Sequence, residues 1–226
     1  MLAGSVAGLG LTAVTATPAL ATCQNVHFNE SVYQSDSYHR GVSASNNGVK
    51  TGSGGNQCDH VVTLDMFHDD FNQAEIGWRV APGANTELTC DYPASETSPR
   101  FLANFTVGGT QHCVLDSPNL TADHFYGMKL AHGGDDLWHY YRDSGSGWVD
   151  LADVQLTYGF AYPATNGERH GSNDSAWALF DGLEYKTTDG TFHPWTIADV
   201  QTLAASDPDW HSVVSQSGTH VEVVHD

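Results

Sequence analysis

Apolar and polar side chains alternate along Phe71-Asn72-Gln73-Ala74-Glu75-Ile76-Gly77-Trp78-Arg79-Val80. Because successive side chains of a strand point to opposite faces, this pattern predicts a strand with one apolar face toward a core. The apolar face carries Ala74, Ile76, Trp78 and Val80, and the other carries Gln73, Glu75, Gly77 and Arg79. A glycine in mid-strand often marks the close approach of a ligand or a neighbouring backbone. Two interpretations follow: this face lines a groove in which Glu75 does chemistry, or Glu75 merely pairs with Arg79 on an exposed strand.

Short runs of the same kind recur along the chain, with Gly, Asn and Asp between them. We expect strands at 61–67, 73–80, 100–107, 125–131, 137–141, 148–151, 154–162, 176–185 and 220–224. Many short strands between turn residues predict an all-β protein, an antiparallel β-sandwich of the jelly-roll or concanavalin-like kind. We also expect one short C-terminal helix over 197–205, with Thr196 as its cap.

Residues 1–21 are expected to be a signal peptide, because they are small and apolar and end in Ala19-Leu20-Ala21, the small-x-small form of a cleavage site. The rest, 22–226, suits a single domain that starts with a flexible polar stretch at 22–57. An even number of cysteines after such a segment predicts a secreted, extracellular protein with two disulfides. The sequence does not tell which cysteines pair. The cysteines are Cys23, Cys58, Cys90 and Cys113.

The charge balance limits the partners of the protein. The chain has 27 acidic residues against 8 basic ones, a formal net charge of −19. Nucleic acid and anionic membrane are therefore excluded as partners, since phosphate binding needs clustered Lys and Arg. Such a charge fits a soluble extracellular protein, and protonation of the 13 histidines would reduce its self-repulsion in mild acid. We expect a monomer.

No metal site or cofactor site is predicted. The histidines lack metal-ligand spacing, and there is no Gly-x-Ser-x-Gly segment for a serine nucleophile. Residues 132–136, His-Gly-Gly-Asp-Asp, have the oxygen ligands that calcium prefers. Gly and Asp are also common in solvent-exposed turns, and we interpret this segment as such a turn. Asn104-Phe105-Thr106 is one of several glycosylation sequons.

Three segments resemble the neprosin-type glutamic endopeptidases, over roughly 61–170. Glu75-Ile76-Gly77-Trp78-Arg79-Val80 is similar to the Glu-x-Gly-Trp-x-Val segment of that family. Arg100 to Thr106 followed by Thr110-Gln111-His112-Cys113 resembles its aromatic strand and its threonine-x-x-cysteine turn. Asn166-Gly167-Glu168 is similar to the Gly-Gly-Glu segment of the second catalytic glutamate, although the family's preceding tryptophan is absent.

The resemblance implies a secreted β-sandwich endopeptidase that acts on polypeptides in acid with two glutamates, and it implies proline-directed cleavage. Glu75 would be the general base and Glu168 the general acid, at the start of the strand after an Asn166-Gly167 turn. Gln73 would donate to the oxyanion, Arg79 would keep Glu75 ionised, and Gly77 and Trp78 would complete the substrate contacts.

Alternatives to this assignment remain open. Glu184 is a second candidate for the acid. A glycoside hydrolase on a similar sandwich would also use two carboxylates, with their separation setting the stereochemistry. In a non-catalytic carbohydrate-binding module, Glu75 would only pair with Arg79.

Overall fold

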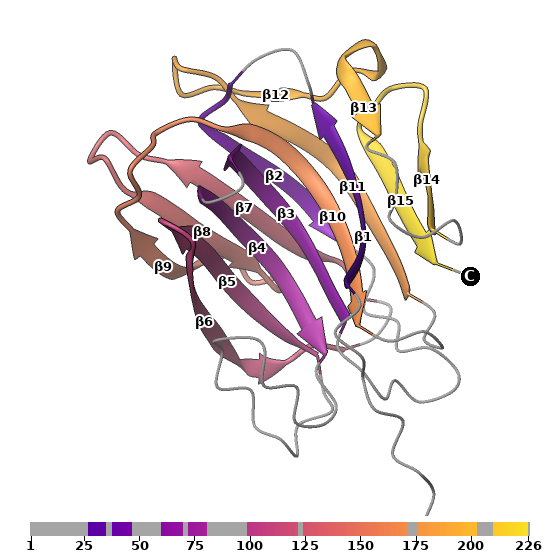
Figure 1. The fold of residues 1–226 in the computed structure, drawn as a ribbon, viewed down its shortest axis with the longest axis horizontal. Helices are drawn as coiled ribbons and strands as arrows, with labels where there is room; N and C mark the ends of the chain where they lie inside the picture. Colours follow the sequence, from indigo (N-terminus) through magenta and orange to yellow (C-terminus); the bar gives the residue numbers. More distant parts are fainter. Residues whose placement is uncertain are drawn as a thin grey trace, which may run out of the picture.

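Two antiparallel sheets are stacked into a β-sandwich (Figure 1). The structure is a computed structural model and describes residues 27–34, 38–46, 60–69, 72–80, 99–121, 124–170, 176–202 and 210–225. One sheet has seven strands in the order β13-β1-β10-β3-β4-β5-β6, and the other has the order β14-β15-β11-β2-β7-β8-β9, with β12 paired to β11. The predicted antiparallel β-sandwich is confirmed.

The strands have the following bounds. The seven-stranded sheet contains β1 (His27–Gln34), β3 (His60–Asp69), β4 (Asn72–Val80), β5 (Arg100–Val107), β6 (Thr110–Asn119), β10 (Tyr162–His170) and β13 (Val200–Thr202). The eight-stranded sheet contains β2 (Gly41–Asn46), β7 (Tyr126–His132), β8 (Trp138–Asp143), β9 (Trp148–Val154), β11 (Ala176–Lys186), β12 (Phe192–Pro194), β14 (Trp210–Val214) and β15 (His220–His225). Strands β1 and β2 both come from the polar stretch 22–57.

The core lies between the two sheets, and β4 turns its apolar face into it. Ala74, Ile76 and Trp78 are almost completely buried, as the alternation predicts. They belong to one cluster with apolar residues of the facing sheet, among them Met128 and Leu130. Burial of such side chains contributes roughly 25 cal/mol per Å² of apolar surface removed from water.

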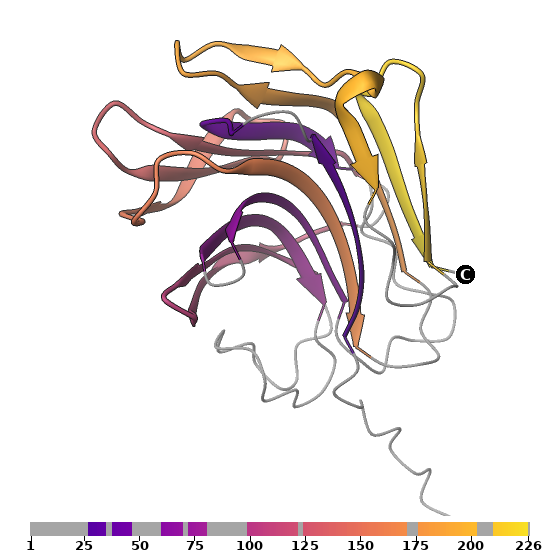
Figure 2. The ribbon, with the colours of Figure 1, turned by 45° about the horizontal axis from the view of Figure 1, so that its top comes forward.

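The seven-stranded sheet is strongly bent. Figure 2 shows β3, β4 and β10 as arched ribbons whose hollow side is turned away from the second sheet. Since Ala74, Ile76 and Trp78 face the second sheet, the alternate residues of β4 lie on this hollow side. We call this surface the hollow face.

Two predictions around residue 160 are wrong. Strand β9 ends at Val154, residues 155–161 form an irregular connection, and β10 begins at Tyr162. Asn166-Gly167 is no turn, because both residues lie inside β10. That strand pairs with β1 on one side and β3 on the other, so two hydrogen-bonded ladders override the local turn preference.

The expected helix over 197–205 is wrong as well. Only Ile197–Asp199 form a 3-10 turn, and Thr196 makes no side-chain capping hydrogen bond. The chain then enters β13, whose residues pair with Val32–Gln34 of β1. Residues 203–205 lie outside the described part of the chain.

The cysteine and targeting predictions are mostly untested. Cys113 on β6 is disulfide-bonded. Cys23, Cys58, Cys90 and the segment 1–21 lie outside the described residues, so the pairing and the signal peptide stay predictions. None of the helical structure in the described ranges is long and apolar enough to cross a membrane.

The bond between Trp78 and Asn46 joins the two sheets, and its loss is expected to destabilise the protein. Trp78 Nε1 donates to Asn46 Oδ1 at 3.0 Å, and Asn46 is 1% exposed. Trp78→Phe leaves this buried oxygen without its donor, which costs about 1–3 kcal/mol of unfolding free energy in urea denaturation. Trp148→Phe, at a tryptophan that is 46% exposed, is the control and should cost clearly less. Equal losses in the two variants would contradict the structural role of this bond.

Candidate active site

Glu75 lies near the middle of the hollow face, between two polar residues of the adjacent strands. In the register of the sheet it is directly opposite Asp65 of β3 and Asn104 of β5. Side chains at such positions share a face, with Cβ atoms about 4.5–5.5 Å apart. Two carboxyl groups and one amide therefore meet across three consecutive strands.

Two amides bind the carboxylate of Glu75. Gln73 Nε2 donates to Oε1 at 3.0 Å, and Asn104 Nδ2 donates to Oε2. Hydrogen bonds to a carboxylate favour its ionised form. Asn104 is only 8% exposed, so its side-chain amide, the acceptor of this glycosylation sequon, is buried against Glu75.

The charge of Glu75 also acts on the core beneath the sheet. Burial raises the pKa of Tyr140 and Tyr158, and the nearby carboxylate of Glu75 raises both further. Both phenols are buried, and neither hydroxyl has a hydrogen-bond partner among the residues that the structure describes. The two tyrosines therefore stay neutral below Glu75.

Asp65 is the second carboxyl group of the site, and the sequence reasoning missed it. It is 8% exposed. On its other side the register places Ala164 of β10, a small residue, and Thr63 and Asn166 are buried further along the same face. The available signal was an aspartate inside the predicted apolar strand at 61–67, at an alternating position whose partner only the register reveals.

The structure does not place Glu168 opposite Glu75. Glu168 pairs with Val61 of β3, and Val61 pairs with Arg79, whereas the level of Glu75 corresponds to Ala164. The two glutamates are thus four residues apart along the strands, about 13 Å, and two strand spacings apart across the sheet, about 9.6 Å.

Arg79 and Glu184 are also remote from Glu75 in the sheet. Arg79 is 2% exposed and lies four residues further along β4. Glu184 belongs to β11, where it faces Ser43, and so lies in the eight-stranded sheet rather than on the hollow face.

Gly77 and Trp78 do not fit the expected substrate contacts. Trp78 is on the core side and bonds Asn46. A Cβ atom at Gly77 would lie 1.9 Å from the carbonyl oxygen of Val62 and 2.7 Å from the Cα of Thr63. The mid-strand glycine therefore marks the close approach of β3, which is one of the two meanings that the sequence allowed.

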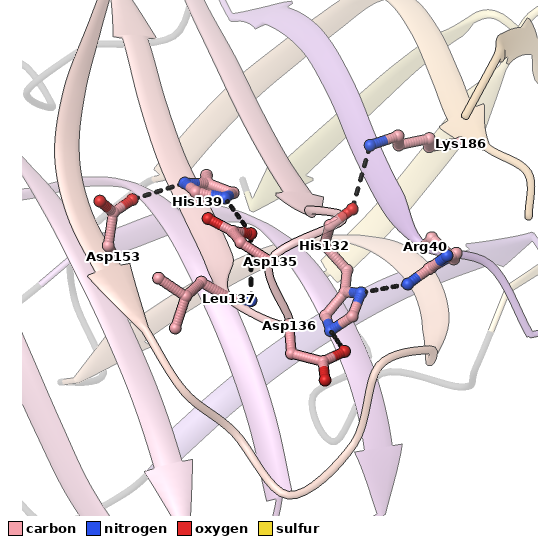
Figure 3. A network of polar contacts seen from close by, with 8 residues as sticks. All are labelled: Arg40, His132, Asp135, Asp136, Leu137, His139, Asp153 and Lys186. Atoms are coloured by element: carbon pink, nitrogen blue, oxygen red, sulfur yellow. Dashed lines mark hydrogen bonds and ion pairs between the residues drawn. The ribbon is translucent and has the colours of Figure 1, made fainter.

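The turn between β7 and β8 holds a separate polar network, drawn in Figure 3. Arg40 Nη2 donates to His132 Nδ1 at 2.6 Å, and Lys186 Nζ donates to the main-chain oxygen of His132 at 3.0 Å. His132 is 5% exposed, and its Nε2 lies 3.9 Å from Asp136. The network borders a pocket of about 500 Å³ that Thr157 also lines.

The acidic residues of this turn face histidines. Asp135 binds His139 Nε2 at 3.1 Å, and Asp153 of β9 binds Nδ1 of the same ring at 2.6 Å (Figure 3). His139, Asp150 and Asp153 also lie close enough together, within 4.8 Å, to share a cation. Carboxylates beside both ring nitrogens favour the protonated form of His139.

The comparisons with known proteins define the class of fold. No model of a known protein family matches the chain, and no curated protein sequence matches it either. Among solved structures the chain shares its two-sheet architecture with glutamic peptidases of the eqolisin type.

Two of these structures illustrate the similarity. Scytalido-glutamic peptidase with a peptide-based transition state analog matches with a TM-score of 0.60 and 11% identity, over 89% of this chain and 99% of that chain. SCP-B, a member of the eqolisin family in complex with the tripeptide Ala-Ile-His, matches with a TM-score of 0.56 and 12% identity over the same shares. At this identity the similarity shows a common fold, and the neprosin-type resemblance stays a prediction.

The packing of β3 against Gly77 predicts an intolerant position. Gly77→Ala forces the two strands apart at the hollow face, and we expect a loss of several kcal/mol of unfolding free energy or no folding, as for other overpacked sites. Gly134→Ala, where no atom of the described part of the chain lies within 4 Å of the added Cβ, is the matched control and should unfold like the wild type. Urea denaturation followed by tryptophan fluorescence measures both variants. A stable Gly77→Ala protein would refute the close approach.

His132 and His139 are expected to affect the pH dependence of stability with opposite signs. Burial and then the charge of Arg40 lower the pKa of His132. Burial also lowers the pKa of His139, but its bonds to Asp135 and Asp153 outweigh this and raise it. Stability that depends on neutral His132 is present above the unfolded value of about 6.5 and is lost as the pH falls through the lower folded value. Stability from charged His139 is present below about 6.5 and is lost as the pH rises through its folded value.

Two substitutions test these signs in unfolding experiments between about pH 5 and about pH 8. His132→Gln, which keeps an acceptor for Arg40, should lose less stability than the wild type on acidification. His139→Gln should be less stable than the wild type in acid, and this difference in unfolding free energy should shrink as the pH rises. Parallel pH profiles for the wild type and both variants would contradict the assignment.

Proposed function

We propose that the chain is a peptidase that hydrolyses polypeptides with two carboxyl groups on the hollow face. The observation that carries the proposal is the direct opposition of Glu75 and Asp65 on adjacent central strands, with two amides bound to Glu75. The fold supports it, because scytalido-glutamic peptidase with a peptide-based transition state analog has the same architecture.

Glu75 is the general base in this proposal. The amides of Gln73 and Asn104 stabilise its ionised form, which takes a proton from the attacking water. The sequence assigns this role to Arg79, but its Cα lies about 13 Å further along the strand, whereas the two amides bond Glu75 directly.

Asp65 is the general acid. Two carboxyl groups in such proximity resist simultaneous ionisation, so one of them keeps a proton in acid. Asp65 is the more buried of the two and donates this proton to the leaving amide nitrogen. Glu168, the acid that the family resemblance implies, is the competing assignment.

Gln73 also donates a hydrogen bond to the oxyanion in this proposal. One N–H of its side-chain amide is bonded to Glu75, and the amide carries a second N–H. This N–H donates to the oxygen of the tetrahedral intermediate, where a single donor is worth about 10²–10³ in kcat.

The setting of the reaction follows from charge and targeting. A peptidase that works with one protonated carboxyl group acts in acid, where protonation of carboxylates and of the 13 histidines also reduces the net charge of −19. The signal segment 1–21 directs the protein outside the cell, where it acts as a monomer. Proline-directed cleavage remains an implication of the neprosin-type resemblance alone.

Digestion of an unfolded protein between about pH 3 and about pH 6 tests the proposal, with peptides identified by mass spectrometry. Wild type should cleave, and Glu75→Gln and Asp65→Asn should each lose about 10²-fold or more in kcat/KM, as expected for general acid–base groups. Glu168→Gln is the matched carboxylate control on the same sheet and should keep most of the activity. Urea denaturation verifies that each variant is folded.

Other outcomes reassign the function. An inactive Glu168→Gln beside an active Asp65→Asn makes Glu168 the acid. Hydrolysis of a polysaccharide without proteolysis makes the protein a glycoside hydrolase. Binding of a polysaccharide without cleavage of either substrate makes it a carbohydrate-binding module.

A further inference from the structure

A cluster of aromatic rings lies at the end of the seven-stranded sheet where β3 ends and β10 begins. The ring of Tyr38 lies 4.4 Å from that of Tyr162, 5.5 Å from that of Phe160 and 5.8 Å from that of His68. His68 is fixed by a contact of 3.2 Å between its Nδ1 and the main-chain oxygen of Phe160. We call Tyr38, His68, Phe160 and Tyr162 the aromatic cluster.

The aromatic cluster is open to solvent. Tyr38 is 44% exposed and Phe160 is 50% exposed. Exposed large apolar side chains scattered singly are normal on a protein surface, but contiguous ones mark binding sites. Phe125 is exposed to a similar extent, 47%, without belonging to this group of rings.

The aromatic cluster adjoins the hollow face. Tyr162 shares that face, since it lies two residues before Ala164, the residue opposite Asp65. The backbone of Tyr162 is two strand spacings across the sheet and two residues along the strand from that of Glu75, a separation of about 12 Å. An extended peptide advances about 3.3 Å per residue, so the cluster is three or four residues from the bond at Glu75.

We propose that the aromatic cluster is a substrate subsite that binds an aromatic or large aliphatic side chain three or four residues from the cleaved bond. The inference rests on the proposed peptidase function. The rings of Tyr38 and Phe160 offer both faces and edges, the geometries in which aromatic side chains pack best. Like any phenol, Tyr38 is neutral throughout the acid range, since the ordinary pKa of tyrosine is about 10.

A cationic side chain fits the subsite less well, although Asp69 is near. The Asp69 carboxylate accepts two hydrogen bonds from Asn72 Nδ2, at 2.8 and 3.1 Å, and lies 4.0 Å from His68 Nε2. The carboxylate that could attract Lys or Arg is therefore already engaged by Asn72 and His68. The remaining interaction is the apolar one.

The test uses two series of peptides that share one cleavage site. The first series varies the third residue from the cleaved bond and the second varies the fourth, and each position is varied on both sides of that bond. Each varied residue is Phe, Leu, Ala or Lys. In at least one position the wild type should cleave the Phe and Leu peptides with a kcat/KM about tenfold higher than that of the Ala peptide. Tyr38→Ala and Phe160→Ala should each reduce this preference to near unity, measured against the Ala peptide in the same variant. Phe125→Ala is the matched control and should keep the preference.

Direct binding separates this proposal from the catalytic one. Glu75→Gln protein is titrated with the Phe and Ala peptides, with and without Tyr38→Ala, and binding is followed by calorimetry. Tighter binding of the Phe peptide that depends on Tyr38 supports the subsite even if no peptide is cleaved, which would overturn only the peptidase function. Cleavage without side-chain preference, a preference for Lys, equal binding of the two peptides, or loss of preference in Phe125→Ala overturns the subsite.

Discussion

Strand β4 must satisfy two surfaces at once, and the rest of the molecule depends on this constraint. Its even-numbered residues close the core, and Trp78 reaches across to Asn46 of the other sheet. Because side chains alternate along a strand, its odd-numbered residues lie on the hollow face. A slip of one residue would move Glu75 into the core and Ile76 to the surface, so the cost of burying a carboxylate fixes the register on which the site depends.

The fold was predictable wherever alternation is strong. Strand β5 begins and ends where the sequence indicates, and the two faces of β4 are those that its pattern predicts. The prediction failed where tertiary pairing opposes local preference. Asn166-Gly167 is drawn into the middle of β10 by partners on both sides, and Val200–Thr202 pair with β1 instead of continuing a helix.

The site was predictable only in part, because its members are neighbours across strands. The sequence identifies Glu75 and Gln73, which share a face two residues apart. Asp65 and Asn104 are 10 and 29 positions away, and nothing in their own segments tells which residues they will face. Their identification needs the register of β3, β4 and β5, which a single sequence does not provide. Asn104 illustrates this limit, because the glycosylation motif around it says nothing of its bond to Glu75.

The order of strands in the seven-stranded sheet has a consequence for how the protein acquires its structure. β3, β4, β5 and β6 are adjacent both in the sheet and in the chain, so hairpin closure alone brings Asp65, Glu75 and Asn104 together. β10 must instead insert between β1 and β3 after a long intervening stretch of chain, and pairings between such distant segments form slowly. The residues of the polar centre thus depend on local chain connections, whereas closure of the sandwich around them depends on a segment that is synthesised much later.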